Sequence, residues 1–279
     1  ERTAVVTRVI VTIVLLVLLG FVVVSLSGSP SLTRFEAFVG DDGWTGILRS
    51  AGLLFFAFAG YARIATLGEE VEDPERTIPR AIPLSLAIEV LVYGLVAAAA
   101  LAAVGAPALA DSSAPLATAV SSTSLTWFEP VVRLGGGVAA LGVLLSLLAG
   151  VSRTVLAMAR DRELPGALAS VHPRFRTPSR AEIAIGLLVI ALVLLVDLRG
   201  AIGFSSFTVL AYYAIANASA WTQADEQRRW PRVLQVLGVT GCLLLAATLP
   251  LASILAGGGV VALGIVVRAV RLVAARSRR

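Results

Sequence analysis

The sequence predicts a polytopic α-helical membrane protein, and three observations lead to this fold class. Of the 279 residues, 57% are hydrophobic and only 15% are charged, whereas a soluble domain carries about 25% charged residues. Long apolar runs recur along the chain, and a helix of roughly 20 such residues crosses the hydrocarbon core. The arginines gather in alternate connections between these runs. A membrane barrel would instead show short segments of alternating polarity, so we expect an all-α chain.

Eight membrane spans are predicted, and together they make a single membrane domain over residues 1–279. Their approximate bounds are 5–26, 47–66, 81–104, 131–157, 181–196, 202–221, 233–249 and 251–270. The fifth span is short, and Ser205, Ser206 and Thr208 interrupt the sixth. The last two spans turn at Pro250 in this interpretation. An alternative places the turn at residues 257–259 and leaves the final stretch at the membrane interface.

The arginine distribution orients these spans. If the N-terminus is cytoplasmic, 18 of the 23 basic residues, all of them arginine, lie inside or at the inner boundary, four lie outside and one lies within a span. This asymmetry agrees with the positive-inside rule. We therefore expect a multi-pass protein of a bacterial plasma membrane with both termini cytoplasmic. Because the chain begins with Glu1 rather than methionine, we also expect a fragment or a chain whose start has been removed.

The composition argues against most catalytic functions. Cys242 is the one cysteine and His172 the one histidine, so an internal disulfide and a Cys/His metal cluster are both ruled out. The chain has no lysine for lysine-dependent chemistry. We expect no enzyme activity, no cofactor and no nucleic-acid partner.

One predicted span weakens in its middle and then ends in acids. Residues 56–74 read FAFAGYARIATLGEEVEDP, and glycine inside a helix costs about 1 kcal/mol relative to alanine. A broken helix within a membrane is tolerated where its backbone is buried in protein or lines a cavity, and transporters use such breaks to bind charged substrates. Gly60 is a candidate position for this break, with Phe56 one turn earlier. The alternative interpretation is that Gly60 only permits close helix packing.

Two long motifs carry a family resemblance. The segment 55–82, FFAFAGYARIATLGEEVEDPERTIPRAI, resembles the sixth helix and following loop of the amino acid–polyamine–organocation transporter superfamily. The segment 152–178, SRTVLAMARDRELPGALASVHPRFRTP, resembles the eighth helix and its loop. The resemblance covers the whole chain and identifies the eight spans with helices five to twelve. It implies the inverted-repeat fold of the leucine-transporter type, with helices one to four missing here.

The resemblance also implies site residues. Phe56 matches the aromatic residue that closes over the substrate, and Ala59, Gly60 and Tyr61 match the unwound substrate-binding segment. Ser146 falls near the part of the eighth helix that faces the substrate and ion sites. Two departures bear on coupling: residues 9–15 lack the lysine that many proton-coupled members carry, and Ala62 stands where relatives often have an acid.

Charged residues supply candidates for coupling and gating. Arg63 and Glu89 fall at comparable depth on consecutive antiparallel spans, and intramembrane charges are usually paired or functional. We expect that they pair or that Glu89 carries a proton; alternatively, Arg63 reaches the cytoplasmic surface along its own stem. Glu70 belongs to an acidic loop that would pair with arginines of residues 160–180 and latch the cytoplasmic side. The alternative is a solvated loop.

The function expected from the resemblance is secondary active transport of amino acids or related amines by alternating access, as proton-coupled symport or as exchange. The implied partners are a small-molecule substrate (an amino acid or a polyamine), the lipid bilayer and protons. Because the first helix supplies half of the substrate site in this fold, we expect that the isolated chain does not transport. The alternatives are a non-transporting membrane subunit or truncated remnant, and an intramembrane enzyme, for which the expected clusters of ionisable residues are missing.

Overall fold

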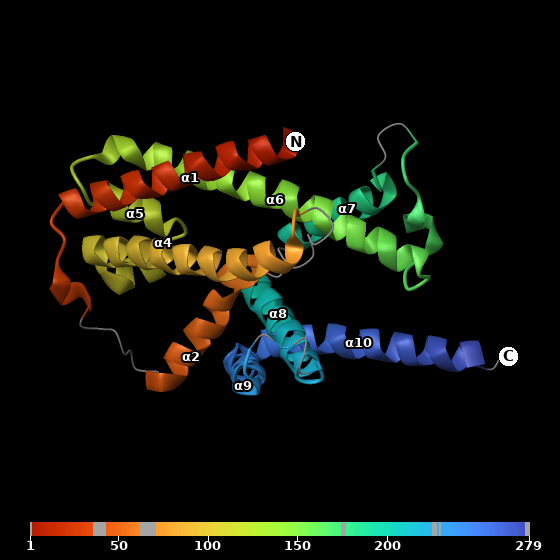
Figure 1. Cartoon of the computed structure of the whole chain (residues 1–279). Helices are drawn as coiled ribbons and strands as arrows, with labels where there is room; N and C mark the ends of the chain where they lie inside the picture. Colours follow the sequence, from red (N-terminus) through yellow and green to blue (C-terminus); the bar gives the residue numbers. More distant parts are fainter. Residues whose placement is uncertain are drawn as a thin grey trace. The chain divides into compact units, whose positions relative to one another are not determined.

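The computed structural model describes residues 2–35, 43–61, 71–173, 177–224, 228 and 230–276. Within these ranges the chain consists of helices and short connections, with no strand. The longer helices are α1 (Arg2–Ser27), α2 (Gly43–Leu54), α4 (Pro74–Ala110), α6 (Glu129–Arg160), α7 (Ser179–Leu195), α8 (Leu198–Trp221), α9 (Arg232–Thr248) and α10 (Leu251–Arg276). The short elements are α5 (Pro115–Ser121) and the 3₁₀ helices η1 (Leu32–Phe35), η2 (Phe55–Tyr61), η3 (Thr126–Phe128) and η4 (Gly166–Ala169). Figure 1 shows these elements along the chain.

Five helices of the described residues are long and apolar enough to cross a membrane. They lie within α1, α4, α6, α8 and α10, and α6 is taken together with η3. Helix α9 is apolar but has only 17 residues. The predicted all-helical, multi-pass character is therefore confirmed, whereas the count of eight spans and the single membrane domain stay predictions. Helix α10 runs without a break through Gly257–Gly259, and the turn before it lies at Leu249 and Pro250.

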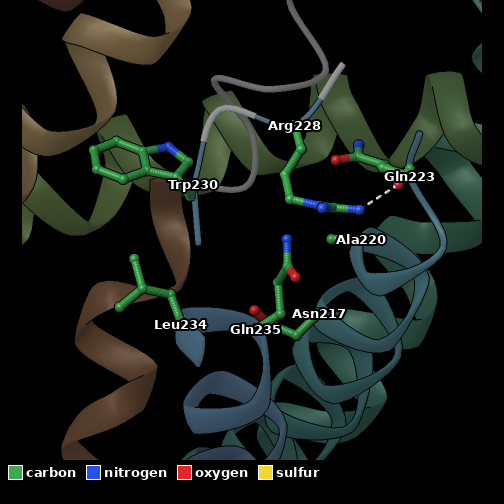
Figure 2. A pocket seen from close by; sticks show the side chains of 7 residues that line it. All are labelled: Asn217, Ala220, Gln223, Arg228, Trp230, Leu234 and Gln235. Atoms are coloured by element: carbon green, nitrogen blue, oxygen red, sulfur yellow. Dashed lines mark hydrogen bonds between the residues drawn. The ribbon is translucent and has the colours of Figure 1, made fainter. Parts of the chain in front are cut away.

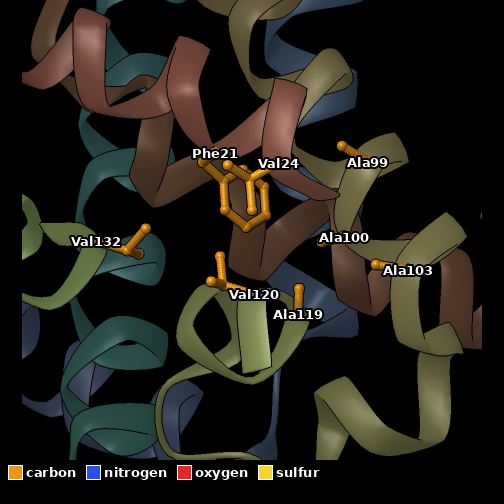
Figure 3. Close-up of a cluster of buried hydrophobic side chains, with 8 residues drawn as sticks. All are labelled: Phe21, Val24, Ala99, Ala100, Ala103, Ala119, Val120 and Val132. Atoms are coloured by element: carbon orange, nitrogen blue, oxygen red, sulfur yellow. The ribbon is translucent and has the colours of Figure 1, made fainter. Parts of the chain in front are cut away.

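The chain forms two compact units. The first comprises Glu1–Phe38 and Ala87–Ile190, and the second comprises Val39–Leu86 and Ala191–Arg279. In the first unit, Phe21 of α1 and Val120 of α5 are fully buried among alanines of α4. Figure 3 shows this core, in which one aromatic ring is surrounded by small side chains. Small residues let helix backbones approach closely where lipid supplies no hydrophobic drive for association.

Glycines set the distance between α1 and α6 in the first unit. A Cβ atom on Gly135 would lie 2.8 Å from Val17, and one on Gly142 would lie 2.9 Å from Ile10. The two glycines are seven residues apart and so share one face of α6. Figure 1 shows α1 running alongside the first half of α6. The pair therefore packs by close backbone approach rather than by large interdigitating side chains.

An arginine caps a break in α4. Gly105 has a non-helical backbone with φ of 79°, which is a conformation that favours glycine. The break leaves the preceding carbonyls without helical partners, and the Arg34 guanidinium of η1 donates to the carbonyls of Ala102 and Ala103. The amide of Ser31 also donates to the Ala102 carbonyl, at 3.1 Å. The connection after α1 is thereby fixed to the end of the long segment of α4.

Helix α8 is the centre of the second unit, because α2, η2, α9 and α10 all pack against it. Leu210, Tyr213 and Ala214 of α8 are buried together with Cys242 and Ala246 of α9. Again the approaches are close. Gly257 of α10 faces the Phe207 ring of α8, and Gly203 of α8 faces Ser253 of α10. Gly52 of α2 lies against the Leu245 carbonyl of α9 and against Leu249, which follows α9.

The α1–α6 contact yields a stability prediction. Gly142→Val should lower the unfolding free energy by about 1–3 kcal/mol, because overpacking forces the helices apart. Gly137→Val is the matched control, since no atom of the described residues lies within 4 Å of a Cβ there and the helix-propensity cost is the same. Thermal unfolding of the purified protein in detergent measures both. Equal melting temperatures for the two variants would show that Gly142 does not set this contact.

Candidate functional site

Helix α2 changes its geometry where the sequence predicts a weak span. The α-helix ends at Leu54, and the chain continues as the 3₁₀ helix η2 over Phe55–Tyr61. A 3₁₀ run of seven residues is longer than usual, and a 3₁₀ stretch within a helix often marks a hinge or a strained site. The change begins five residues before Gly60, so the irregular stretch includes Phe56, Ala59 and Gly60.

Two side chains of α8 hold the backbone of this irregular stretch. The Ser206 hydroxyl donates to the Leu53 carbonyl at 3.2 Å, next to the end of α2. The Tyr213 hydroxyl donates to the Ala59 carbonyl at 3.2 Å, in the last turn of η2. Ser206 and Tyr213 are two helical turns apart, so they lie on one face of α8. Both donors therefore meet carbonyls at the two ends of the irregular stretch.

These donors supply hydrogen bonds that lipid cannot supply. Carbonyls at a helix end lack intrahelical partners, and in lipid no water replaces them. Ser206 is fully buried and Tyr213 is only 4% exposed, so the bonds form inside the unit. The Phe55 ring also packs edge-on against the Tyr213 ring, with centroids 5.6 Å apart. Tyr213 thus contacts the first residue of η2 with its ring and a late residue with its hydroxyl.

The side chains of η2 differ in exposure. Phe56 is 46% exposed, Ala59 is half-buried and Gly60 is exposed. No atom of the described residues lies within 4 Å of a Cβ built on Gly60. Both interpretations of Gly60, as a helix break and as a close-packing residue, stay predictions. The side chain of Tyr61 lies outside the described parts, although its backbone completes η2.

The other predicted site residues belong to the first unit or lie outside the described residues. Ser146 is an exposed residue of α6 in the first unit, so its place in a common site with Phe56 stays a prediction. Arg63 and Glu70 lie outside the described residues, and with them the proposed ion pair and the latch. Glu89 is described: it is half-buried on α4.

Glu89 shares a face of α4 with residues of the core. Tyr93, Val96, Ala100 and Ala103 follow it at helical spacings of four, seven, eleven and fourteen residues. Ala100 and Ala103 are buried in the first core, and Val96 packs against it. Glu89 therefore shares a side of α4 with this core, although Tyr93 between them is 41% exposed. Intramembrane carboxylates on such a face are typical of ion and proton pathways.

The chemistry available at η2 is binding. Within the described ranges no three His, Cys, Asp or Glu side chains come close enough to hold a metal ion. What η2 presents is an exposed aromatic ring and a glycine beside an irregular backbone. Such a stretch offers amide and carbonyl groups to a polar or zwitterionic ligand.

Within the described part of the chain, five helices long enough to span a bilayer define a multi-pass membrane protein. Beside them, the shorter α2 continues as an irregular 3₁₀ stretch that α8 holds by hydrogen bonds, as is typical of transporters. Comparison with known proteins specifies the family. A family profile described as amino acid permease matches residues 2–272, and the chain belongs to this family. The resemblance that the motifs at 55–82 and 152–178 carry is thereby confirmed.

Relatives with transporter names agree with this assignment. An uncharacterized transporter of Mycobacterium tuberculosis is 53% identical over all of this chain and 63% of its own length. The human cationic amino acid transporter 4 is 35% identical over 75% of this chain and 32% of its own length. The branched-chain amino acid permease BcaP of Bacillus subtilis is 27% identical over 71% of this chain and 42% of its own length. The chain thus spans under two thirds of the relatives it matches.

Sequence reasoning missed the two donors on α8. Ser206 was read as an interruption of a span, but α8 is continuous there and the hydroxyl reaches Leu53 on another helix. Tyr213 carried no motif. Its seven-residue spacing from Ser206 was the available signal, because two polar groups on one face of a membrane helix need partners.

Removal of the Tyr213 hydroxyl tests the clamp on η2. Tyr213→Phe keeps the ring packed against Phe55 but leaves the Ala59 carbonyl without this donor. The net loss is about 1 kcal/mol, which would raise local amide exchange in residues 55–61 roughly fivefold. Tyr212→Phe is the control, because Tyr212 is an exposed neighbour. Hydrogen exchange followed by mass spectrometry measures both variants, and identical exchange in the two would contradict the clamp.

Proposed function

We propose that this chain forms part of a secondary active transporter for amino acids or related amines, in which its eight predicted spans correspond to helices five to twelve. The observation that carries the proposal is the α-to-3₁₀ change at Phe55, which falls in the motif that resembles the substrate-binding helix of the superfamily. Membership in the amino acid permease family supports it. The fold proposed is the inverted-repeat arrangement of the leucine-transporter type.

The proposed mechanism needs no covalent chemistry. The amide and carbonyl groups of Ala59, Gly60 and Tyr61 bind the charged ends of the substrate, because an irregular backbone in lipid has hydrogen-bonding capacity to offer. Phe56 then covers the bound molecule. Alternating access means that the substrate reaches this segment first from one side of the membrane and leaves it to the other side. The hydrogen bonds from Ser206 to the end of α2 and from Tyr213 to η2 give the moving segment a fixed support.

The substrate class proposed is amino acids in the broad sense. Two of the relatives above have names that refer to cationic and to branched-chain amino acids. The small Ala59 side chain leaves room for a substrate beside the backbone. The acidic loop that includes Glu70 and the basic loop at residues 160–180 would close the cytoplasmic side by ion pairing.

Coupling to protons is assigned to Glu89. Glu89 lies on the face of α4 that also contains the buried Ala100 and Ala103. Protonation would remove an intramembrane charge whose burial is costly. Arg63 on the preceding span is its proposed ion-pair partner.

Substitution of Phe56 tests the binding role. In proteoliposomes that contain the protein as it occurs in its native membrane, Phe56→Ala should lower kcat/KM for amino acid uptake by roughly tenfold or more, since about 1.5–3 kcal/mol of apolar contact is lost. Trp44→Ala is the matched control, because Trp44 is an 80% exposed aromatic residue at the start of α2, the helix that continues into η2. Equal losses in both variants would argue against a specific role for Phe56. Lack of uptake and of amino acid binding in the wild type would favour the non-transporting subunit.

Substitution of Glu89 tests the coupling role. Glu89→Gln should abolish the pH dependence of uptake while net uptake at a saturating substrate concentration persists, because the amide keeps the size but does not titrate. Glu75→Gln, in the first turn of the same helix, is the control. Uptake is measured across a pH series with and without an imposed proton gradient. A pH profile unchanged from the wild type would remove Glu89 from the coupling mechanism.

A further inference from the structure

The connection between α8 and α9 contains a hollow that the proposed transport site does not use. It has a volume of about 610 Å³ and is lined by Asn217, Ala220, Gln223, Arg228, Trp230, Leu234 and Gln235. Figure 2 shows the side chains of Asn217, Gln235 and Arg228 gathered at its centre. The volume falls within the range of small-ligand sites, and the lining mixes carboxamides with one guanidinium.

One polar atom in the hollow is buried without a partner. Gln235 is only 8% exposed, and its Oε1 atom has no hydrogen-bond partner among the described residues. A buried carbonyl oxygen of this kind costs free energy comparable to a lost hydrogen bond unless a ligand or water supplies a donor. The adjacent Asn217 carboxamide donates to the Tyr213 carbonyl at 2.8 Å, which fixes its orientation. The site therefore offers an acceptor to a hydroxyl or ammonium group.

A cation lies over the same hollow. The Arg228 guanidinium donates to the Gln223 carbonyl at 2.7 Å, which holds it across the opening (Figure 2). Guanidinium groups bind phosphate oxygens with planar, charge-assisted hydrogen bonds. An anion bound here would meet this cation on one side and the Gln235 acceptor on the other, so the matching ligand carries both a phosphate and a hydrogen-bond donor.

The surroundings of the hollow resemble the membrane interface. Trp230 is exposed at the rim, and Trp221 is exposed at the end of α8 with the Arg232 guanidinium 5.4 Å above its ring. Tryptophan concentrates at the depth of lipid headgroups. The arginines of this connection also assign it to the cytoplasmic side, where anionic lipids attract basic groups.

We propose that the hollow between α8 and α9 binds the headgroup of an anionic phospholipid with hydroxyl donors, such as phosphatidylglycerol. The phosphate lies against Arg228, and a headgroup hydroxyl donates to Gln235 Oε1. The bound lipid joins the start of α9 to the end of α8, the helix that supports η2. Occupancy therefore stabilises the helix pair on which the proposed transport site rests, but lipid binding itself does not depend on transport.

Native mass spectrometry of the full protein, delipidated in detergent and titrated with defined lipids, tests the proposal. The wild type should bind one phosphatidylglycerol about tenfold more tightly than phosphatidylcholine. Phosphatidylmethanol, which has the same charge and no headgroup hydroxyl, should bind more weakly than phosphatidylglycerol. Gln235→Met should abolish the preference between these two anionic lipids, and Arg228→Gln should weaken both by about tenfold. Arg268→Gln on α10 makes the same charge change elsewhere and should bind like the wild type.

Three outcomes overturn the proposal. Equal binding of phosphatidylcholine would show that no anion is selected, and wild-type behaviour of Gln235→Met and Arg228→Gln would place the lipid elsewhere. Tight binding of soluble glycerol 3-phosphate that displaces the lipid would assign the hollow to a soluble phosphate ester instead. Melting temperatures of the lipid-free variants near that of the wild type establish that both variants fold.

Discussion

The hydrogen-bonding needs of backbone groups inside a membrane govern this structure. A regular helix satisfies its own carbonyls and amides, whereas each departure from helical geometry exposes groups that lipid does not solvate. The described chain departs from a regular helix at two notable places, and each departure has a donor from another element. Arg34 donates hydrogen bonds to the carbonyls before Gly105 in α4. Ser206 donates to the Leu53 carbonyl near the end of α2, and Tyr213 donates to the Ala59 carbonyl in the irregular stretch that follows.

These two cases differ in what they leave exposed. The break at Gly105 lies against the Arg34 side chain, which fills the space beside it. The stretch over Phe55–Tyr61 is held at its ends, but Phe56 and Gly60 between them remain exposed. The second departure therefore leaves an irregular backbone open to a ligand, and we propose that it is the one that binds the substrate.

Much of this was predictable from sequence, because membrane insertion imposes strong one-dimensional signals. Long apolar runs and clustered arginines identified an all-helical, multi-pass chain, and the two motifs identified the amino acid permease family. The weak point near Gly60 was visible as a glycine among aromatics. The irregular geometry of this stretch was predictable because it depends on local residue choice, whereas its role as the substrate site stays a prediction.

What the sequence left open concerns contacts between distant segments. Nothing local indicates that Ser206 meets Leu53, 153 residues away, since serine on a membrane helix also bonds its own preceding turn. The α-helix ends at Leu54 rather than at Gly60 because tertiary contacts of Phe55 with Tyr213 override local propensity. Gln235 belongs to no motif, and its burial beside Asn217 and Arg228 is visible only in the structure.

The central claim is that the irregular stretch after α2 binds the transported amino acid. The most direct measurement is the reaction rate of a membrane-impermeant thiol reagent with Ala59→Cys, in a protein in which Cys242 and every other native cysteine have been replaced by alanine. The account predicts that amino acids taken up by the protein slow this reaction in a saturable way, with half-protection near their KM, and that other solutes have no effect. Saturable uptake together with a labelling rate that no transported amino acid changes would contradict the claim.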